Sequence, residues 1–323
     1  MKLLPKIALF ATFISLFSCS APQTRTCSGM TWNTTYSITY SHSADLTDSI
    51  HSIMRQVELS VSPFIATSVI SAVNKGNSDT VDEIFTDVFS LSQHICSISN
   101  GAFDPTLSPL INIWKFGYDD SNAPTDSAIT AALSSVGILD CKIFDGKLIK
   151  KTPETEFNFS AIAKGYGCDA IGRMMQRNGC QNFLIEIGGE ITARGLNPKG
   201  EKWRVIIDAP ISCNDSVVHQ QLKIIEVTDC GVTTSGNYRN FYTDSLGNRI
   251  SHTISPKTGM PIQTETLSAT VIAPDCATAD ALATACMAMP TDSAVKMISN
   301  IQGVSAIIVT AGNSAKWNVI EVK

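Results

Sequence analysis

The chain has 323 residues, of which 44% are hydrophobic and 16% are charged, and its formal net charge at pH 7 is -5. A chain of this length can bury the core of one large α/β unit. The acidic balance and the lack of a basic patch argue against a nucleic-acid-binding protein.

The N-terminus has the features of a signal peptide. Lys2 and Lys6 precede an apolar run over residues 7–17, which is too short to span a bilayer. The run ends in Leu16-Phe17-Ser18-Cys19, which resembles the bacterial lipobox, where the cysteine becomes the lipid-bearing N-terminus. Simple cleavage and an incidental cysteine are the alternatives.

The domain boundaries follow from this interpretation. We expect a signal peptide over residues 1–18, a small polar tether over residues 19–29 and one folded domain over residues 30–323. A lipid on Cys19 would anchor an exported protein to a bacterial membrane on the periplasmic side.

Hydrophobic patterns predict both strands and helices in the folded domain. Runs rich in β-branched residues predict strands at residues 35–40, 183–187, 203–207, 223–227, 267–273 and 305–310. Helical periodicity predicts helices at residues 45–59, 81–97, 126–136, 163–177, 277–289 and 293–299. Residues 240–243 and 249–254 flank a turn-forming segment and predict a β-hairpin.

These elements predict an α+β fold, a single large mixed α/β unit with antiparallel or mixed sheets flanked by helices. The strands do not alternate with helices regularly enough to require a Rossmann arrangement. No GxGxxG motif follows a strand, and GxSxG, HExxH and P-loop motifs are absent from the sequence.

The cysteines do not indicate a disulfide scaffold. Ten occur in the chain, and assigning Cys19 to a lipid leaves an odd number. Cys168, Cys276 and Cys286 lie in segments that read as helical or buried, so we expect them to act as small core hydrophobes.

Asp280 and Thr284 lie four residues apart in an alanine-rich segment that favours helix. Their oxygens therefore project from one face, one turn apart. A carboxylate and a hydroxyl so placed can bind Mg²⁺, which takes one or two carboxylates together with phosphate oxygens and water. The alternative is a solvated aspartate beside a threonine that bonds its own backbone.

Two further motifs lie upstream. Ser160 opens the helical segment of Lys164, where free N–H groups and the lysine charge suit a pyrophosphate, although an ordinary N-cap with a surface lysine explains the pattern equally. The strand at 185–187 ends in Gly188-Gly189 and Glu190. A ligand could approach the glycines, although a bulge is the commoner reason for them. Salt bridges with Arg194 or Arg204 are the expected role of Glu186 and Glu190.

A last polar cluster combines residues 233–239 with residues 251–259. Hydroxyl groups, Arg239 and His252 are crowded into these two adjoining segments. The other four histidines lack comparable polar neighbours in the sequence.

Taken together, the motifs resemble the ApbE family of FAD:protein FMN transferases. The resemblance runs in order through these segments: 34–38, 101–106, 109–110, 114–117, 160–166, 185–190, 234–240, 251–259 and 271–284. It implies transfer of FMN from FAD to a threonine or serine hydroxyl of an acceptor protein, with release of AMP.

The resemblance also implies site residues. FAD would be contacted by Met30, Ala102, Phe103, Asp104, Asn158, Lys164 and Ile254. Mg²⁺ would be held by Asp280, Thr284 and the backbone oxygen of Ala161. His252 is the candidate base for the hydroxyl proton, or alternatively orients the phosphate or the substrate.

Three residues depart from the family pattern. Asn33 replaces a glycine, Asn158 replaces an aspartate and Ser255 replaces an aspartate. The rival functions are a Mg²⁺-dependent FAD pyrophosphatase, which yields FMN and AMP, and a non-catalytic FAD-binding lipoprotein. The family suggests an acceptor in a membrane redox complex of the RNF or sodium-translocating NADH:quinone oxidoreductase type.

Overall fold

The computed structural model describes residues 23–114, 124–211, 220–236, 241–243, 249–251, 253–262, 264–312 and 317–323. The expected signal peptide, Cys19 and His252 lie outside these residues. Within the described part, every helix is too short or too polar to cross a membrane.

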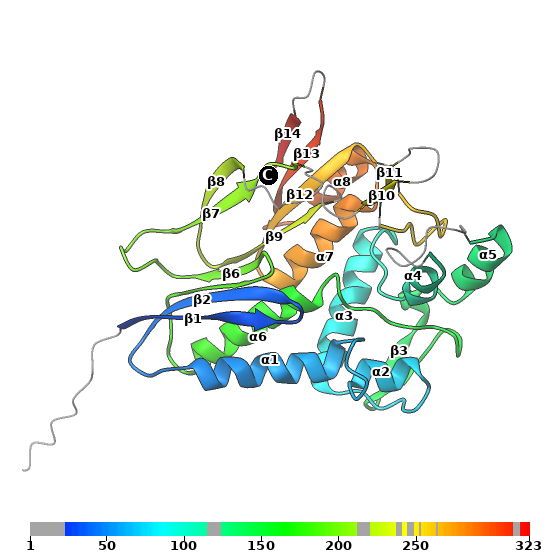
Figure 1. Ribbon diagram of the computed structural model, residues 1–323, viewed down its shortest axis with the longest axis horizontal. Helices are drawn as coiled ribbons and strands as arrows, with labels where there is room; N and C mark the ends of the chain where they lie inside the picture. The colour runs from blue at the N-terminus through cyan, green and yellow to red at the C-terminus, as the bar shows by residue number, and fades with distance from the viewer. Residues whose placement is uncertain are drawn as a thin grey trace, which may run out of the picture.

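The central element is an eight-stranded antiparallel sheet (Figure 1). In spatial order its strands are β1 (Gln23–Thr31), β2 (Thr34–His42), β5 (Phe183–Ile187), β6 (Glu190–Arg194), β9 (Cys230–Gly236), β12 (Thr266–Ala273), β13 (Ser305–Ala311) and β14 (Trp317–Val322). Three antiparallel pairs stand apart: β3 (Lys142–Phe144) with β4 (Lys147–Ile149), β7 (Trp203–Asp208) with β8 (Gln221–Val227), and β10 (Phe241–Thr243) with β11 (Arg249–Ser251).

Eight α-helices accompany the sheets in the described part of the chain. They are α1 (Thr47–Val61), α2 (Val69–Asn74), α3 (Glu83–Ile98), α4 (Ser108–Trp114), α5 (Asp126–Ser134), α6 (Ala163–Arg177), α7 (Cys276–Met287) and α8 (Thr291–Ser299). A short 3-10 helix, η1, spans Ile138–Asp140. Side chains cap several of these helices, as when Asp82 accepts a hydrogen bond from the backbone N–H of Phe85 at 2.8 Å.

All the predicted strands and helices are present, with ends within two residues of the expected ones, and the predicted hairpin is the β10–β11 pair. The α+β class is confirmed, and every pairing in the large sheet is antiparallel. The order of the strands was not predictable from local patterns, because it depends on pairings between distant segments.

The expected boundary at residue 30 was wrong, because β1 begins at Gln23. Its residues pair with β2 along the whole strand, from Gln23 opposite His42 to Thr31 opposite Thr34. The strand lies at the sheet edge with mostly exposed side chains, so it lacks the buried alternation that marks a strand in a sequence. Backbone pairing with β2 defines it, supported by hydrogen bonds from the Arg25 side chain and by the buried Cys27.

The paired glycines form a turn and not a bulge. Gly188 and Gly189 connect β5 to β6, with φ angles of 66° and 100°. Two consecutive positive φ values are typical of the tight two-residue hairpin turn that glycine favours. This turn carries Glu190 back into the protein, where it is 5% exposed.

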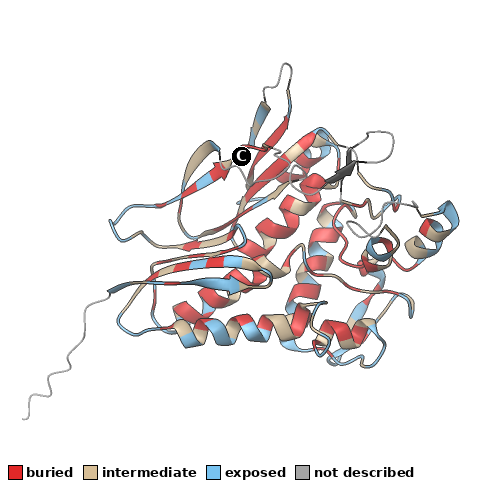
Figure 2. Cartoon of the chain, in the orientation of Figure 1, coloured by how far each residue is buried: buried red, intermediate tan, exposed pale blue. Residues whose placement is uncertain are grey.

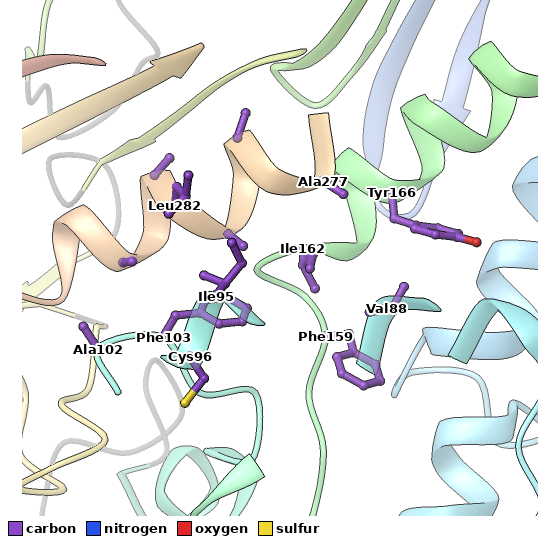
Figure 3. Packing of buried hydrophobic residues seen from close by; sticks show 14 of the residues in the cluster. Val88, Ile95, Cys96, Ala102, Phe103, Phe159, Ile162, Tyr166, Ala277 and Leu282 are labelled. Carbon is purple, nitrogen blue, oxygen red and sulfur yellow. The ribbon is translucent and has the colours of Figure 1, made fainter. Parts of the chain in front are cut away.

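Helices cover one face of the sheet in two layers (Figure 1). The inner layer contains α6, which packs on β5 and β6, and α7, which packs on β9 and β12. The outer layer contains α1, which contacts α6, and α3, which contacts α7. Figure 2 shows the buried residues concentrated along these helices and the facing strands. The main apolar core lies between the layers, where side chains of α3, α6 and α7 meet those of residues 102–103 (Figure 3).

Two glycines allow α7 to approach its neighbours closely. A Cβ on Gly165 of α6 would lie 2.5 Å from the carbonyl oxygen of Cys276. A Cβ on Gly231 of β9 would lie 2.3 Å from the backbone nitrogen of the same residue. Because backbone atoms cannot move aside as a flexible side chain can, these positions require glycine. The close contact brings the start of α6 against the first turns of α7.

Candidate functional site

A polar cavity of about 380 Å³ lies where the start of α6, one face of α7 and the end of β9 meet. Its walls also include residues 102–105, Glu190 at the start of β6, and Thr253 and Ile254. These segments are distant in the sequence, and tertiary packing alone brings them together. The volume lies within the range of small-molecule sites.

Asp280 and Thr284 both line this cavity from α7. Asp280 is 3% exposed, and its Oδ2 accepts a hydrogen bond from the backbone N–H of Gly165 at 3.1 Å. Burial raises the pKa of Asp280, whereas the charge of Lys164 and the Gly165 N–H act in the opposite direction. The Oγ1 atom of Thr284 lies 3.4 Å from the Oγ of Ser235. The predicted common face of the aspartate and the threonine is therefore confirmed.

Lys164 and Glu190 form an ion pair in the cavity wall, with Nζ 2.9 Å from Oε1. Burial lowers the pKa of Lys164, but the charges of Asp280 and Glu190 raise it more, so this side chain stays protonated. Burial, followed by the charge of Asp280, raises the pKa of Glu190 against the opposing effect of Lys164. The expected partners of Glu190, Arg194 and Arg204, were wrong: Arg194 pairs with Asp229 instead, at 3.2 Å.

The second carboxylate oxygen of Glu190, Oε2, is buried and has no hydrogen-bond partner among the described residues. A buried polar atom without a partner is unfavourable unless a ligand, ion or water satisfies it. Two acidic side chains, Asp280 and Glu190, face the single lysine in this wall, and their raised pKa values show that their charged forms lack compensation there. A cation in the cavity would supply it.

The turn before α6 differs from the predicted N-cap. The helix begins at Ala163, and Ile162 at the N-cap position makes no side-chain capping bond. Ser160 lies two residues earlier, where its N–H donates to Oδ1 of Asn158 at 2.9 Å. The Gly165 N–H of the first turn is already bonded to Asp280, so a protein carboxylate occupies part of the expected anion position. Ala161 and Ser160 both line the cavity.

Residues 102–104 form another wall, as Figure 3 shows for Ala102 and Phe103 beside α3. The carboxylate of Asp104 accepts hydrogen bonds from the backbone N–H groups of Thr106 at 2.9 Å and Ile138 at 3.1 Å. Burial raises the pKa of Asp104, and the hydrogen bonds from Thr106 lower it. This side chain therefore holds two loops together, and a contact with FAD stays a prediction.

Asn158 and Ile254 also lie in the cavity wall. The N–H of Asn158 donates to the carbonyl oxygen of Pro105 at 2.7 Å, which ties it to the 102–105 wall. Ile254 is 3% exposed and forms an isolated β-bridge with Pro261. His252 is outside the described residues, and its neighbour Thr253 lines the cavity.

A second hollow of about 740 Å³ shares Ser160 and Lys164 with the cavity. Its wall includes Trp32 in the turn after β1 and Phe64, whose exposed fraction is 86%. Met30 is 69% exposed and is absent from the described lining of either hollow. Of this segment, the turn at Trp32 and Asn33 lies in the wall of the second hollow, and a contact of Met30 with FAD stays a prediction.

The donor set fits one hard cation. No cluster of three or more histidine, cysteine, aspartate or glutamate residues suited to a metal occurs in the described part of the chain. The expected Mg²⁺ ligands are one carboxylate, one hydroxyl and one backbone carbonyl, and all three residues line the same cavity. Such a set suits Mg²⁺, which completes its shell with water and phosphate oxygens, and it does not suit zinc.

Sequence reasoning assigned no ligand-binding role to Glu190, Trp32 and Phe64, and it included Ser235 only within the polar cluster of residues 233–239. No local signal marks Phe64 or Trp32, because only folding brings their segments beside Lys164. The glycine pair before Glu190 was a usable signal, since a tight hairpin turn would have directed that side chain back toward the sheet.

The eight described cysteines are all free thiols, and seven of them are buried. Burial raises the pKa of Cys168, Cys276 and Cys286, so these thiols stay protonated. Their expected role as core hydrophobes is confirmed by their packing, because Cys286 belongs to the main core and the other two to the core between β5 and α6.

The structure is an α+β fold with a cavity whose wall combines acidic groups, hydroxyl groups and a lysine among apolar side chains. A family model described as the ApbE family matches residues 32–308. The chain belongs to the ApbE family. The match covers the sheet from β2 to the first half of β13 and every segment of the cavity wall, and it leaves out the edge strands β1 and β14.

The FAD:protein FMN transferase of Vibrio cholerae is 34% identical over 88% of this chain and 87% of its own length. That of Haemophilus influenzae is 31% identical over 92% of this chain and 90% of its own. The solved structure of the flavin transferase ApbE from Vibrio cholerae matches with a TM-score of 0.82 and 31% identity, covering 94% of this chain and 98% of that one. The flavinyl transferase ApbE of Pseudomonas stutzeri matches with a TM-score of 0.83 and 29% identity, covering 94% and 96%.

Proposed function

We propose that this protein transfers FMN from FAD to a threonine or serine hydroxyl of another protein, with release of AMP and with Mg²⁺ as cofactor. The observation that carries the proposal is the common cavity of Asp280, Thr284, Ala161 and Lys164. Such a wall combines the donors of a magnesium site with a permanent positive charge. The names of the relatives agree with it.

Asp280, Thr284 and the carbonyl oxygen of Ala161 would hold the cation, which when bound neutralises charge on the phosphate oxygens. Lys164 binds a phosphate oxygen from the same side. Its ammonium group is already oriented by Glu190 at 2.9 Å, so little reorganisation is needed when the ligand arrives. The protein therefore acts by positioning and electrostatics, without a covalent enzyme intermediate.

The reaction forms one bond and breaks one. The acceptor oxygen bonds to the phosphorus on the FMN side of the pyrophosphate, and the bond from this phosphorus to the bridging oxygen breaks. AMP leaves with that oxygen and the electron pair. We assign the hydroxyl proton to His252, because its neighbour Thr253 lines the cavity and an imidazole titrates near neutral pH.

FAD would extend across the cavity and the hollow of Trp32 and Phe64. The two spaces share Ser160 and Lys164, so a pyrophosphate at Lys164 leaves one end of the ligand in the second hollow. An exposed phenylalanine and a tryptophan offer flat apolar surfaces on which an aromatic ring can stack. Asn158, Ala102 and Ile254 would contact the part that stays in the cavity.

The place of the reaction follows from the N-terminal sequence. The signal peptide and Cys19 support an exported protein held by a lipid on the periplasmic side of a membrane. The acceptor would then be a periplasmic segment of a membrane redox complex, of the RNF or sodium-translocating NADH:quinone oxidoreductase type. Metabolic labelling with a tagged fatty acid, compared with a Cys19→Ala variant, tests the anchor.

Mass spectrometry of an acceptor protein incubated with this protein, FAD and Mg²⁺ tests the transfer. We expect the mass of one FMN on a single threonine or serine, an equal amount of AMP, and loss of both when EDTA removes the metal. A matched incubation without acceptor separates the rivals. Rapid conversion of all FAD to FMN and AMP there would identify a pyrophosphatase, and bound FAD without any AMP would identify a carrier.

A further inference from the structure

A third hollow borders the cavity, and it has no described lining residue in common with the hollow of Trp32 and Phe64. It has a volume of about 570 Å³ and lies between the end of α3, residues 255–258 and α8. Ala102 and Ala288 belong to the walls of both this hollow and the cavity. A molecule bound in this hollow therefore lies against the wall of the cavity.

Two lysines give this hollow a positive charge. Lys257 and Lys296 both line it and are both exposed, and no aspartate or glutamate is among its described lining residues. Neither lysine forms an ion pair within the described part of the chain. Asp292 and Glu265 line an adjoining hollow that shares Pro290 with this one, and Asp292 lies one turn before Lys296 on α8. The lining of the lysine hollow itself is nevertheless positive, in a chain whose net charge is -5.

The rest of the wall suits an extended peptide. Met289 and Met297 are buried and form an apolar floor, and Asn100, Thr258 and Ser293 supply hydrogen-bonding groups at the rim. Methionine adapts its shape to different side chains, which suits a surface that must accept a peptide. Lysine charges at the rim attract an acidic partner and set its orientation.

We propose that this hollow, lined by Lys257 and Lys296, docks an acidic segment of the acceptor protein next to its modified hydroxyl. The inference rests on the proposed function. The cavity shares Ser160 and Lys164 with the hollow of Trp32 and Phe64, through which FAD would extend. It shares Ala102 and Ala288 with the hollow of the two lysines, so an acceptor segment bound there adjoins the cavity without occupying the wall at Lys164.

Fluorescence anisotropy of two short labelled peptides tests the docking surface. One peptide has a single threonine flanked by aspartates, and the other has lysines in place of the aspartates. Wild type, a Lys257→Glu/Lys296→Glu variant and a control variant, Lys142→Glu/Lys199→Glu, are compared with FAD and Mg²⁺ present. The control changes the net charge equally, on β3 and on the loop before β7.

The acidic peptide should bind wild type and the control variant with the same affinity. The Lys257→Glu/Lys296→Glu variant should bind it about tenfold more weakly at low salt, and the difference should be smaller at high salt. FAD affinity should be the same in all three proteins, which shows that the cavity is folded. Equal binding of the acidic peptide by all three proteins, or equal loss in the control, would overturn the proposal. Binding that follows the charge pattern while FMN reaches no acceptor would support the surface and contradict the proposed function.

Discussion

Asp280, Lys164 and Glu190 bring two acidic groups and one basic group into one cavity wall. Asp280 is 3% exposed, and Glu190 is 5% exposed with one oxygen unpartnered in the described part of the chain. Lys164 is bonded to Glu190, and its charge lowers the pKa of Asp280 against the effect of burial. Because a buried charge is unfavourable without a partner, the ionised form of each group depends on the others.

Replacement of Asp280 tests the metal assignment. Asp280→Ala removes the only carboxylate among the expected Mg²⁺ ligands, so the rate of FMN transfer should fall at least about a hundredfold. Initial rates measured over a range of Mg²⁺ concentrations would show this. Asp48→Asn, an exposed site on α1 that lines neither the cavity nor the lysine hollow, is the control and should keep the wild-type rate. A variant lacking Asp280 that works at the wild-type rate would refute the assignment.

Replacement of Lys164 tests the ion pair. Lys164→Met leaves two buried carboxylates without a counter-charge, so the free energy of unfolding should fall by about 2–3 kcal/mol, less than for a fully buried pair because Lys164 is partly exposed. Urea denaturation without metal measures this. The double variant Lys164→Met/Glu190→Gln should recover much of the loss. If it is no more stable than Lys164→Met, the two side chains do not interact as described.

At the scale of elements, the site depends on how α6 meets α7. Asp169 of α6 accepts hydrogen bonds from the backbone N–H groups of Cys276 at 3.0 Å and Ala277 at 2.8 Å, at the start of α7. Gly165, one turn earlier on α6, contacts the same region and donates to Asp280. The orientation of the α7 face that carries Asp280 and Thr284 is therefore set by its contacts with α6 and not by α7 alone.

The pKa of Asp169 gives a stability prediction. Burial raises it from 3.8 to about 6, although the two N–H groups act against this shift. The folded protein then holds this proton more tightly than the unfolded chain, so stability from this group is present below pH 4 and falls as pH rises to about 6. The loss should be on the order of 3 kcal/mol.

Unfolding of wild type and Asp169→Asn at pH 4, 5, 6 and 7 isolates this effect, because the variant cannot titrate at that position. The free energy of unfolding of wild type minus that of the variant should decrease across the series. A difference that stays constant or increases with pH would show that the carboxylate is ionised throughout. Thr192 donates to Asp169 at 2.8 Å, and a Thr192→Val variant should steepen the decrease.

At the scale of the whole molecule, the cavity joins segments from both halves of the chain. Residues 102–105 and 158–164 meet residues 234–236 and the face of α7. Few of these segments would hold their places alone, since they lie at the ends of elements and in loops. A ligand that contacts all of them should therefore stabilise the entire fold.

FAD with Mg²⁺ should raise the free energy of unfolding by about 2.7 kcal/mol when the free ligand is at a hundred times its dissociation constant. Thermal unfolding with FAD alone, Mg²⁺ alone and both together measures the linkage. FAD and Mg²⁺ added together should raise the unfolding temperature by more than the sum of the shifts that each gives alone. The reason is that the cation and the negatively charged pyrophosphate would attract each other within one cavity. No thermal shift with both ligands at high concentration would contradict the site.

Patterns within a short stretch of sequence predicted the features that depend on neighbouring residues, such as helix ends and the side chains that share one helix face. Helix α6 was predicted with its observed ends, and the spacing of Asp280 and Thr284 on α7 fixed their common face whatever else folded. The exposed strand β1 was missed because it buries almost no side chains and depends on backbone pairing with β2. The N-cap expected at Ser160 was wrong because the loop bonds to Asn158 instead.

The sequence by itself determined most of the longer helices and strands, the common face of Asp280 and Thr284, and the family, since these depend on residue types at short spacings. Only the tertiary structure decided that Glu190 pairs with Lys164, that Trp32 and Phe64 line a hollow with the same lysine, and that Lys257 and Lys296 line another hollow bordering the cavity. The physical reason is distance along the chain. Contacts between remote segments arise from close packing of the whole core, and no periodicity within one segment encodes them.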